Sequence, residues 1–240
     1  MNTVDDSILA EICSLLREND INYWVCHGTL LGIIRENRLL PWDHDIDIAV
    51  WKDEVSKKEI IEILNKVGYI NEPVFGDMDC LHFVGFRKKV DVSFYSREKK
   101  TASIKWLSPE MNIPVKLLLR FTEILCSEHK IEHPISRGFL YSSAFYLLYL
   151  SGKVSKIIMP EIFKNYIKNN LVNKLTYIGY SYNLELMKFK DMDYKNFQIR
   201  VPIDSKECLR NTYGNDWNVA KKDYVWHTEA NNLVETKGNK

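Results

Sequence analysis

Cysteine is scarce in this sequence, and none of the five cysteines lies in a C-x-x-C pair. Their odd number and wide spacing argue against a disulfide framework and against a cysteine-rich structural zinc site. A reducing compartment such as the cytoplasm therefore suits the chain better than an extracellular one. Glycine and proline are also few, at 10 and 7 residues, and no stretch rich in them separates the chain into domains.

Long apolar runs are missing as well. No run approaches the roughly 18 residues that a transmembrane helix needs. The amino terminus, MNTVDDSILAEICSLL, carries two acidic residues where a signal peptide has its positive charges. We therefore expect a cytoplasmic protein without a transmembrane segment. Peripheral association with the inner face of the cytoplasmic membrane stays open.

An excess of charge of one sign is absent too. The 33 Lys and Arg residues against 32 Asp and Glu residues leave a formal net charge of +1, which gives a nucleic-acid partner no bulk electrostatic support. We expect no such partner. With 45% apolar and 27% charged residues, the composition is that of a globular protein, and 240 residues suffice for one domain or a core with an appendage.

Apolar residues recur at helical spacing in some segments and alternate in others. We expect an α+β fold in a single domain, residues 1–240: a small mixed sheet flanked by helices at about 1–100, a helical region at about 101–195, and a C-terminal element at about 196–240 that packs on the core. The pattern predicts strands at 23–26, 45–51, 80–86 and 90–95, and helices at 4–16, 29–36, 54–67, 114–125, 139–150, 159–170 and 204–213.

The strand predicted at 45–51 carries two carboxylates on one face, because Asp45 and Asp47 are two residues apart. Such neighbouring anions repel each other and are costly to desolvate, and a divalent cation removes both penalties. Hard oxygen ligands suit Mg²⁺. Asp91, in a second apolar strand, supplies a third acid if the two strands are neighbours. Three acids with a glycine-containing turn upstream are typical of a phosphoryl-transfer site.

Other interpretations of these acids stay open. A single D-x-D pair is common, and Asp91 has Lys88 and Lys89 nearby as partners for a structural ion pair. The spacing of the acids from Asp43 onward also resembles an EF-hand calcium loop. That loop needs glycine where this chain has Ile48, so the calcium interpretation is weak.

Two linked motifs, G-T-L-L-G-I-I-R and L-P-W-D-H-D-I-D-I, resemble the signature of the LicD family of phosphotransferases, within the nucleotidyltransferase-fold superfamily. The segment V-P-I-D-S-K-E-C-L-R-N-T-Y-G-N-D-W resembles a C-terminal element of the same family. The likeness is dense over residues 24–51, recurs at 90–95 and 200–217, and is thin over 100–195. It implies a nucleotidyltransferase-like core.

The resemblance also implies roles for individual residues. Asp45, Asp47 and Asp91 would be the catalytic acids and the ligands of Mg²⁺, a site that Mn²⁺ would also suit. Substrate contacts would come from five residues: His27, Gly28, Thr29, Arg35 and Asp43. Of these, Gly28 and Thr29 would receive phosphate at the start of a helix. Structural alternatives are an ordinary turn at Gly28, a solvated helix end at Arg35 and a hydrogen-bonded core histidine at His27.

The activity that the resemblance implies moves a phosphorylated alcohol from a CDP-activated donor to a hydroxyl of a cell-surface glycan or glycolipid, with release of CMP. Choline phosphate, ribitol phosphate and glycerol phosphate are the candidate groups. Aromatic residues of the predicted helical region, such as Trp106 and Tyr149, would offer an acceptor surface or belong to the core. Two alternatives remain: transfer of a nucleotide with release of pyrophosphate, and a non-catalytic relative that binds nucleotide or glycan.

Overall fold

The structure is a computed structural model that describes residues 4–72, 79–85, 88–110, 112–126, 139–172 and 175–237. The chain divides into two compact units. We call Met1–Trp106 with Ile178–Glu235 the core unit, and Leu107–Tyr177 with Thr236–Lys240 the helical unit. Each is described by itself.

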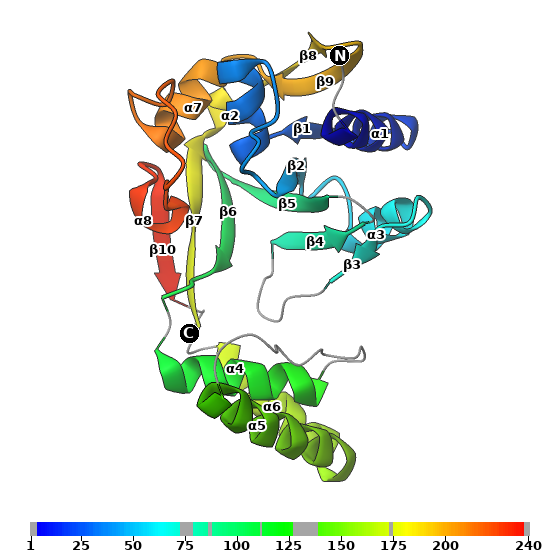
Figure 1. Cartoon of the computed structure of the whole chain (residues 1–240), viewed down its shortest axis with the longest axis vertical. Helices are drawn as coiled ribbons and strands as arrows, with labels where there is room; N and C mark the ends of the chain where they lie inside the picture. The colour runs from blue at the N-terminus through cyan, green and yellow to red at the C-terminus, as the bar shows by residue number, and fades with distance from the viewer. Residues whose placement is uncertain are drawn as a thin grey trace. The chain divides into compact units, whose positions relative to one another are not determined.

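An eight-stranded mixed sheet organises the core unit (Figure 1). The strands follow the order β1-β2-β5-β6-β7-β10, and β4 pairs with β5 and with β3 beside that path. β2 is parallel to β5, whereas β1 runs antiparallel to β2 and β4 antiparallel to β5. The strands are β1 (Tyr23–Val25), β2 (Asp45–Trp51), β3 (Ile70–Asn71), β4 (Cys80–Val84), β5 (Lys89–Glu98), β6 (Thr101–Leu107), β7 (Thr176–Asn183) and β10 (Leu233–Lys237).

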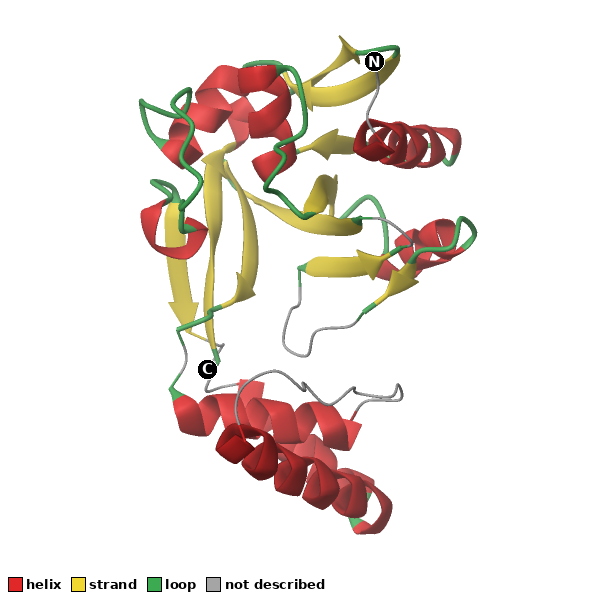
Figure 2. Ribbon diagram, in the orientation of Figure 1, coloured by secondary structure: helices red, strands yellow, loops and turns green. Residues whose placement is uncertain are grey.

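Helices and a second, two-stranded sheet complete the two units (Figure 2). The core unit adds α1 (Val4–Glu18), α2 (His27–Glu36), α3 (Lys57–Asn65), the short 3-10 helix η1 (Leu184–Leu186), the antiparallel pair β8 (Phe189–Tyr194) and β9 (Phe197–Pro202), α7 (Ser205–Tyr213) and α8 (Trp226–Glu229). The helical unit contains α4 (Ile113–Cys126), which contacts both α5 (Phe139–Ile158) and α6 (Glu161–Val172). Within the described residues, no helix has the length and apolarity to cross a bilayer.

The alternation of β2 decides which of its side chains face the apolar core. Ile46 and Ile48 are fully buried and belong to the cluster that α1 and α3 complete with Leu9 and Ile60. Asp45 and Asp47 point to the opposite face, which Ala49 and Trp51 continue into a second, aromatic-rich cluster. β2 therefore places two carboxylates at the open end of an otherwise buried strand.

The predicted α+β class, with a mixed sheet flanked by helices, is confirmed. The predicted extent of the helical region, about 101–195, is wrong at both ends, because β6, β7 and β8 lie there. Ala102 and Ile104 are buried while Lys105 between Ile104 and Trp106 is exposed, which is the alternation of a strand half covered by a core. Trp106 is thus a strand residue. The side chains of residues 139–146, including Tyr141, lie outside the described residues.

Candidate active site

Three carboxylates gather at the start of β2. Asp43 lies in the turn before the strand, and Asp45 and Asp47 lie on one face of it. One oxygen from each comes within 4.8 Å of the others. The predicted pair of acids is thus part of a group of three. Its additional member, Asp43, precedes the strand.

The first turn of α2 packs against this acidic group. The residue before the helix, Cys26, is extended at φ −135° and provides no side-chain cap, and His27 then adopts a left-handed conformation with φ 46°. A Cβ on Gly28 would overlap the Asp43 carboxylate and stand 3.4 Å from Asp47 Oδ2. Glycine is therefore required for the acids to approach the positive end of the helix dipole.

Thr29 connects α2 to β2 through hydrogen bonds with Asp47. Its backbone N–H donates to Asp47 Oδ2 at 3.2 Å, and its hydroxyl accepts the N–H of Asp47 at 2.8 Å and lies 3.4 Å from Asp47 Oδ2. The residue is only 2% exposed. These contacts make Thr29 the residue that orients Asp47, while its contact with a phosphate stays a prediction.

Burial and mutual repulsion disfavour negative charge in this group. The pKa of Asp47 is held well above its ordinary range, first by burial and then by the charges of Asp45, Asp43 and Asp91, against which the Thr29 N–H acts. The pKa of Asp43 is raised to about 7, again first by burial and then by its hydrogen bond to Asp45. Carboxylates in such surroundings are stabilised by a cation.

This donor set fits a hard divalent cation. The ligand atoms are carboxylate oxygens close enough to share one ion, and their raised pKa values indicate that the acids lack enough positive charge nearby. Mg²⁺ binds such oxygen ligands and usually keeps positions for water and substrate phosphates. Asp45, Asp47 and Asp43 are thus the residues that would hold it.

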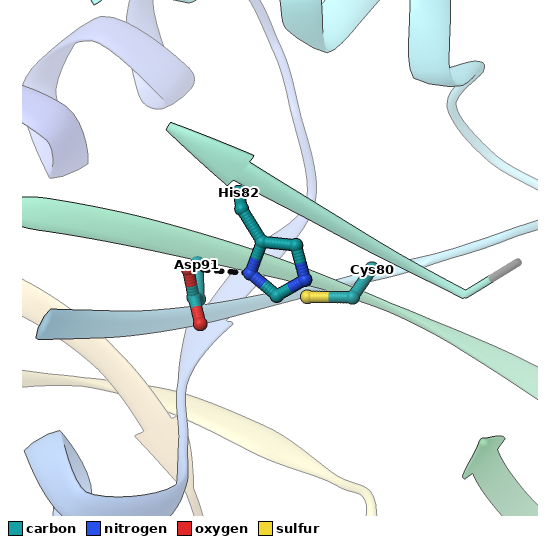
Figure 3. A group of neighbouring side chains, drawn as sticks. All are labelled: Cys80, His82 and Asp91. Atoms are coloured by element: carbon teal, nitrogen blue, oxygen red, sulfur yellow. Dashed lines mark hydrogen bonds and ion pairs between the residues drawn. The ribbon is translucent and has the colours of Figure 1, made fainter. Parts of the chain in front are cut away.

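Asp91 stands next to this group across the sheet. The parallel pairing of β2 with β5 places Asp91 opposite Asp47, so both side chains leave the same face. Asp91 Oδ1 lies 3.0 Å from His82 Nδ1 on β4, and Cys80 approaches the same two residues, as Figure 3 shows. The predicted third acid is therefore the neighbour of Asp47, and it has a histidine partner that the sequence analysis missed.

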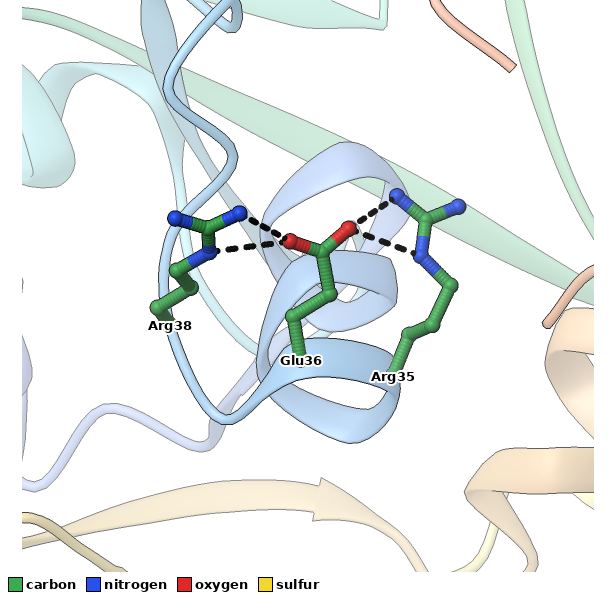
Figure 4. A network of polar contacts seen from close by, with 3 residues as sticks. All are labelled: Arg35, Glu36 and Arg38. Carbon is green, nitrogen blue, oxygen red and sulfur yellow. Dashed lines mark hydrogen bonds and ion pairs between the residues drawn. The ribbon is translucent and has the colours of Figure 1, made fainter. Parts of the chain in front are cut away.

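Arg35 is anchored at the other end of α2. Its Nε and Nη2 contact Glu36 Oε1 at 3.1 and 2.7 Å, while Arg38 holds Glu36 Oε2 (Figure 4). The pKa of Glu36 is lowered, mainly by its hydrogen bonds with Arg38 and also by those with Arg35. The Arg35 side chain is 6% exposed and lines the cavity described below. The alternative of a solvated helix end is therefore wrong.

His27 lies among aromatic rings. Its ring centre is 5.4 Å from that of Trp106 and 5.3 Å from that of Tyr180, and its Nε2 is 3.4 Å from the Tyr95 hydroxyl. Burial lowers its pKa to about 4, against the opposing effect of Asp45, so the imidazole is neutral near pH 7. Nδ1 is buried and has no hydrogen-bond partner in the described part of the chain.

The acids, His27, Gly28 and Arg35 border one cavity of about 680 Å³ within the core unit, whereas Thr29 lies behind its lining. One wall carries the acids, His82 and Arg35. A second wall comes from the C-terminal segment, with Tyr213, Trp217 and Lys222. Tyr213 and Trp217 also pack against the core, so the lining and structural roles of these residues coincide. A pocket of this size suits a nucleotide-sized ligand.

Residues 20–136 match the family described as LicD/FKTN/FKRP, nucleotidyltransferase domain. This match confirms the resemblance that the motifs indicate. Over 63 residues the chain is 35% identical to an uncharacterized protein of Rickettsia prowazekii (strain Madrid E), covering 26% of this chain and 24% of that protein. Over 48 residues it is 31% identical to the ribitol 5-phosphate transferase FKRP of Homo sapiens, covering 20% of this chain and 10% of FKRP. The matches thus span a quarter or less of these relatives.

Among solved structures, the chain is similar to the lincosamide antibiotic adenylyltransferase LnuA in its lincomycin-bound form. The identity is 13%, the match covers 87% of this chain and 86% of LnuA, and the TM-score is 0.43. ANT(2")-Ia in complex with adenylyl-2"-tobramycin matches with 12% identity and a TM-score of 0.36, over 70% of this chain and 99% of that one.

Proposed function

Because this chain belongs to the LicD family through residues 20–136, we propose that it is a transferase of phosphorus-containing groups. In this proposal, the chain moves a phosphorylated alcohol from a CDP-activated donor to a hydroxyl of a cell-surface glycan or glycolipid, and CMP leaves. Choline phosphate, ribitol phosphate and glycerol phosphate are the candidate groups. The observation that carries the proposal is the group of Asp43, Asp45 and Asp47 against the uncapped start of α2.

The arrangement supports this chemistry because it joins cation ligands to an anion-binding helix end. The carboxylates of Asp45 and Asp47 would hold Mg²⁺ or Mn²⁺, with Asp43 or Asp91 completing the set. When bound, the cation supplies positive charge to the diphosphate and to its developing negative charge. Gly28 lets the carboxylates of Asp43 and Asp47 approach the start of α2, and phosphate oxygens bound to the same cation would meet the positive end of this helix dipole.

The chain's own residues would position and activate the acceptor. The acceptor oxygen attacks the phosphorus distal to the cytidine, the bond from that phosphorus to the bridging oxygen breaks, and CMP departs with this oxygen. Asp91 would receive the acceptor proton, and His82, whose Nδ1 is 3.0 Å from Asp91 Oδ1, would orient this carboxylate. Arg35, fixed by Glu36, would bind a phosphate of the donor with its remaining donors.

An assay of released products tests this proposal. The chain is incubated with CDP-choline, CDP-ribitol or CDP-glycerol, Mg²⁺ and a panel of glycan acceptors, and CMP and pyrophosphate are both measured. Release of CMP that depends on acceptor supports the proposal, whereas release of pyrophosphate from a nucleoside triphosphate would replace it with nucleotide transfer. Binding of donors without either product would point to a non-catalytic relative.

Two matched variants make the assay specific. Asp45→Asn should reduce CMP release by at least about 100-fold, because one ligand of the cation and its charge are lost. Asp193→Asn removes an exposed carboxylate on β8 and should leave the rate unchanged. Equal rates in both variants would contradict the role given to Asp45.

The proposal includes a setting for the reaction. We propose that the protein works in the cytoplasm, in peripheral contact with the inner face of the membrane. We also propose that it has no nucleic-acid partner, because a formal net charge of +1 gives such a partner no bulk electrostatic support.

A further inference from the structure

The core unit contains a second group of potential metal ligands, distinct in chemistry from the three carboxylates of β2. Cys80 and His82 are two residues apart on β4, so both side chains leave the same face. The antiparallel pairing with β5 sets His82 opposite Asp91. One ligand atom from each of the three residues lies within 4.8 Å of the others (Figure 3).

We propose that Cys80, His82 and Asp91 form a separate cation site for a divalent ion of borderline softness, for which Zn²⁺ is the natural probe. A thiolate, an imidazole and a carboxylate are the three ligand types that Zn²⁺ takes in proteins. Mg²⁺, in contrast, prefers oxygen ligands alone. The two neighbouring groups would therefore select different ions.

The distances are close to those of a tetrahedral site. Two nitrogen or oxygen ligands of a tetrahedral Zn²⁺ lie about 3.4 Å apart, and a sulfur and a nitrogen about 3.6 Å apart. His82 Nδ1 and Asp91 Oδ1 are already 3.0 Å apart. One ligand atom from each of Cys80, His82 and Asp91 lies within 4.8 Å of the others, so shifts of about 1.2 Å or less would bring the three into the range of a tetrahedral ion.

Access and an open coordination position complete the site. Cys80 is 4% exposed, but Cys80, His82 and Asp91 all line the 680 Å³ cavity, which provides the path of entry. Three protein ligands leave the fourth position of a tetrahedral ion for water or substrate. Because Asp91 is also the neighbour of Asp47, this carboxylate would be shared between the two cation sites.

Binding of Co²⁺ to the full-length chain tests the proposal, because Co²⁺ replaces Zn²⁺ and gives a thiolate-to-cobalt charge-transfer band. We expect this band at one equivalent of Co²⁺, with displacement by Zn²⁺ and no effect of excess Mg²⁺. Cys80→Ser should abolish the band and His82→Gln should weaken Co²⁺ binding at least about tenfold. The control Cys208→Ser, at another buried cysteine, and Asp45→Asn should both retain it.

The opposite results would overturn the site: no charge-transfer band, a band that persists in Cys80→Ser, or a band that excess Mg²⁺ removes. A second measurement covers the case in which Cys80→Ser does not fold. In the unaltered chain, Zn²⁺ should slow alkylation of Cys80 at least about tenfold without changing that of Cys208, as followed by mass spectrometry, and equal effects at both cysteines would refute the site. Neither readout uses CMP release, so failure of this site and failure of the proposed transferase activity are distinguishable.

Discussion

Asp43 carries a titration that should be visible in the stability of the metal-free protein. Its pKa is about 7 in the folded chain and about 3.9 in an unfolded one. The folded state therefore binds the proton more tightly, so stability from this group is present below about pH 4 and is lost as the pH rises to about 7.

We expect Asp43→Asn to remove this loss. In buffer with a chelator, the variant should exceed the unaltered protein in free energy of unfolding by about 1–3 kcal/mol near pH 7.5, a range that is reduced for the partial exposure of the group. The difference should shrink toward pH 4. Urea denaturation at several pH values measures it, and a pH-independent difference would show that Asp43 does not titrate in this range.

Thr29 offers a test of what holds Asp47 in place. Thr29→Val keeps the shape of the side chain but leaves the Asp47 N–H without its acceptor, at a cost of about 1–3 kcal/mol. Thr29→Ser keeps the hydroxyl and loses one buried methyl, at a cost of about 1 kcal/mol. Denaturation of both variants gives the comparison. Should Ser prove as harmful as Val, packing and not hydrogen bonding would explain the burial of Thr29.

The sequence predicts some site residues and not others for a definite reason. Asp45, Asp47 and Gly28 lie in continuous motifs, so local spacing suffices to find them. Cys80 and His82 acquire meaning only from the register that sets His82 opposite Asp91, and register depends on contacts between distant segments. Cysteine spacing alone excludes a cysteine-rich zinc site. It does not exclude a site that combines three residue types from two strands.

At the scale of the element, α2 links the acids to Arg35. The helix begins at His27, two residues before the predicted start, because the Leu30 N–H already donates to the Cys26 carbonyl at 2.9 Å. It ends at Glu36, and the capping residue Asn37, left-handed at φ 53°, donates its N–H to the carbonyls of Gly32 and Ile33. These ends fix Gly28 and Arg35 on one rigid segment.

Arg35→Lys tests whether Arg35 of α2 binds the CDP-activated donor. Lysine retains the charge but loses the planar fork that Glu36 orients. We expect an increase of about tenfold in the KM for the CDP-alcohol, equivalent to about 1.4 kcal/mol, with little change in kcat. Arg38→Lys is the matched control, since Arg38 contacts the same glutamate from an exposed position. Equal changes in both variants would locate the effect in Glu36 instead.

Strand prediction succeeded where apolar and polar residues alternate along the segment, and it failed where only partners distant in the sequence make the segment a strand. β2 was predicted at 45–51 and is confirmed there, because its isoleucines alternate with acids. β7 was missed although Tyr177 and Tyr180 are typical strand residues. Its neighbours in the sheet, β6 and β10, are distant in the sequence, so nothing local indicates that this segment has a partner.

At the scale of the whole molecule, the helical unit has exposed apolar residues that suit the proposed contact with a membrane surface. Around the end of α5 and the start of α6, Ile157, Ile158 and Ile162 are 86%, 72% and 82% exposed. The same two helices contain four lysines and a single acid, Glu161. Exposed apolar residues beside basic ones are typical of a surface that lies in the interface of an anionic bilayer.

We expect the protein to bind vesicles that contain phosphatidylglycerol and to bind vesicles of phosphatidylcholine alone far more weakly, because each lysine near the surface adds about 1 kcal/mol only when the lipids are anionic. Replacing Ile157 and Ile162 together by serine should lower the partition coefficient at least about tenfold, since the apolar contribution is lost. Ile70→Ser changes a residue of the core unit that is 66% exposed and should leave binding unchanged. Co-sedimentation measures all three proteins. Equal binding to both vesicle types, or an equal loss in the Ile70 variant, would leave the two isoleucines without a role at the membrane.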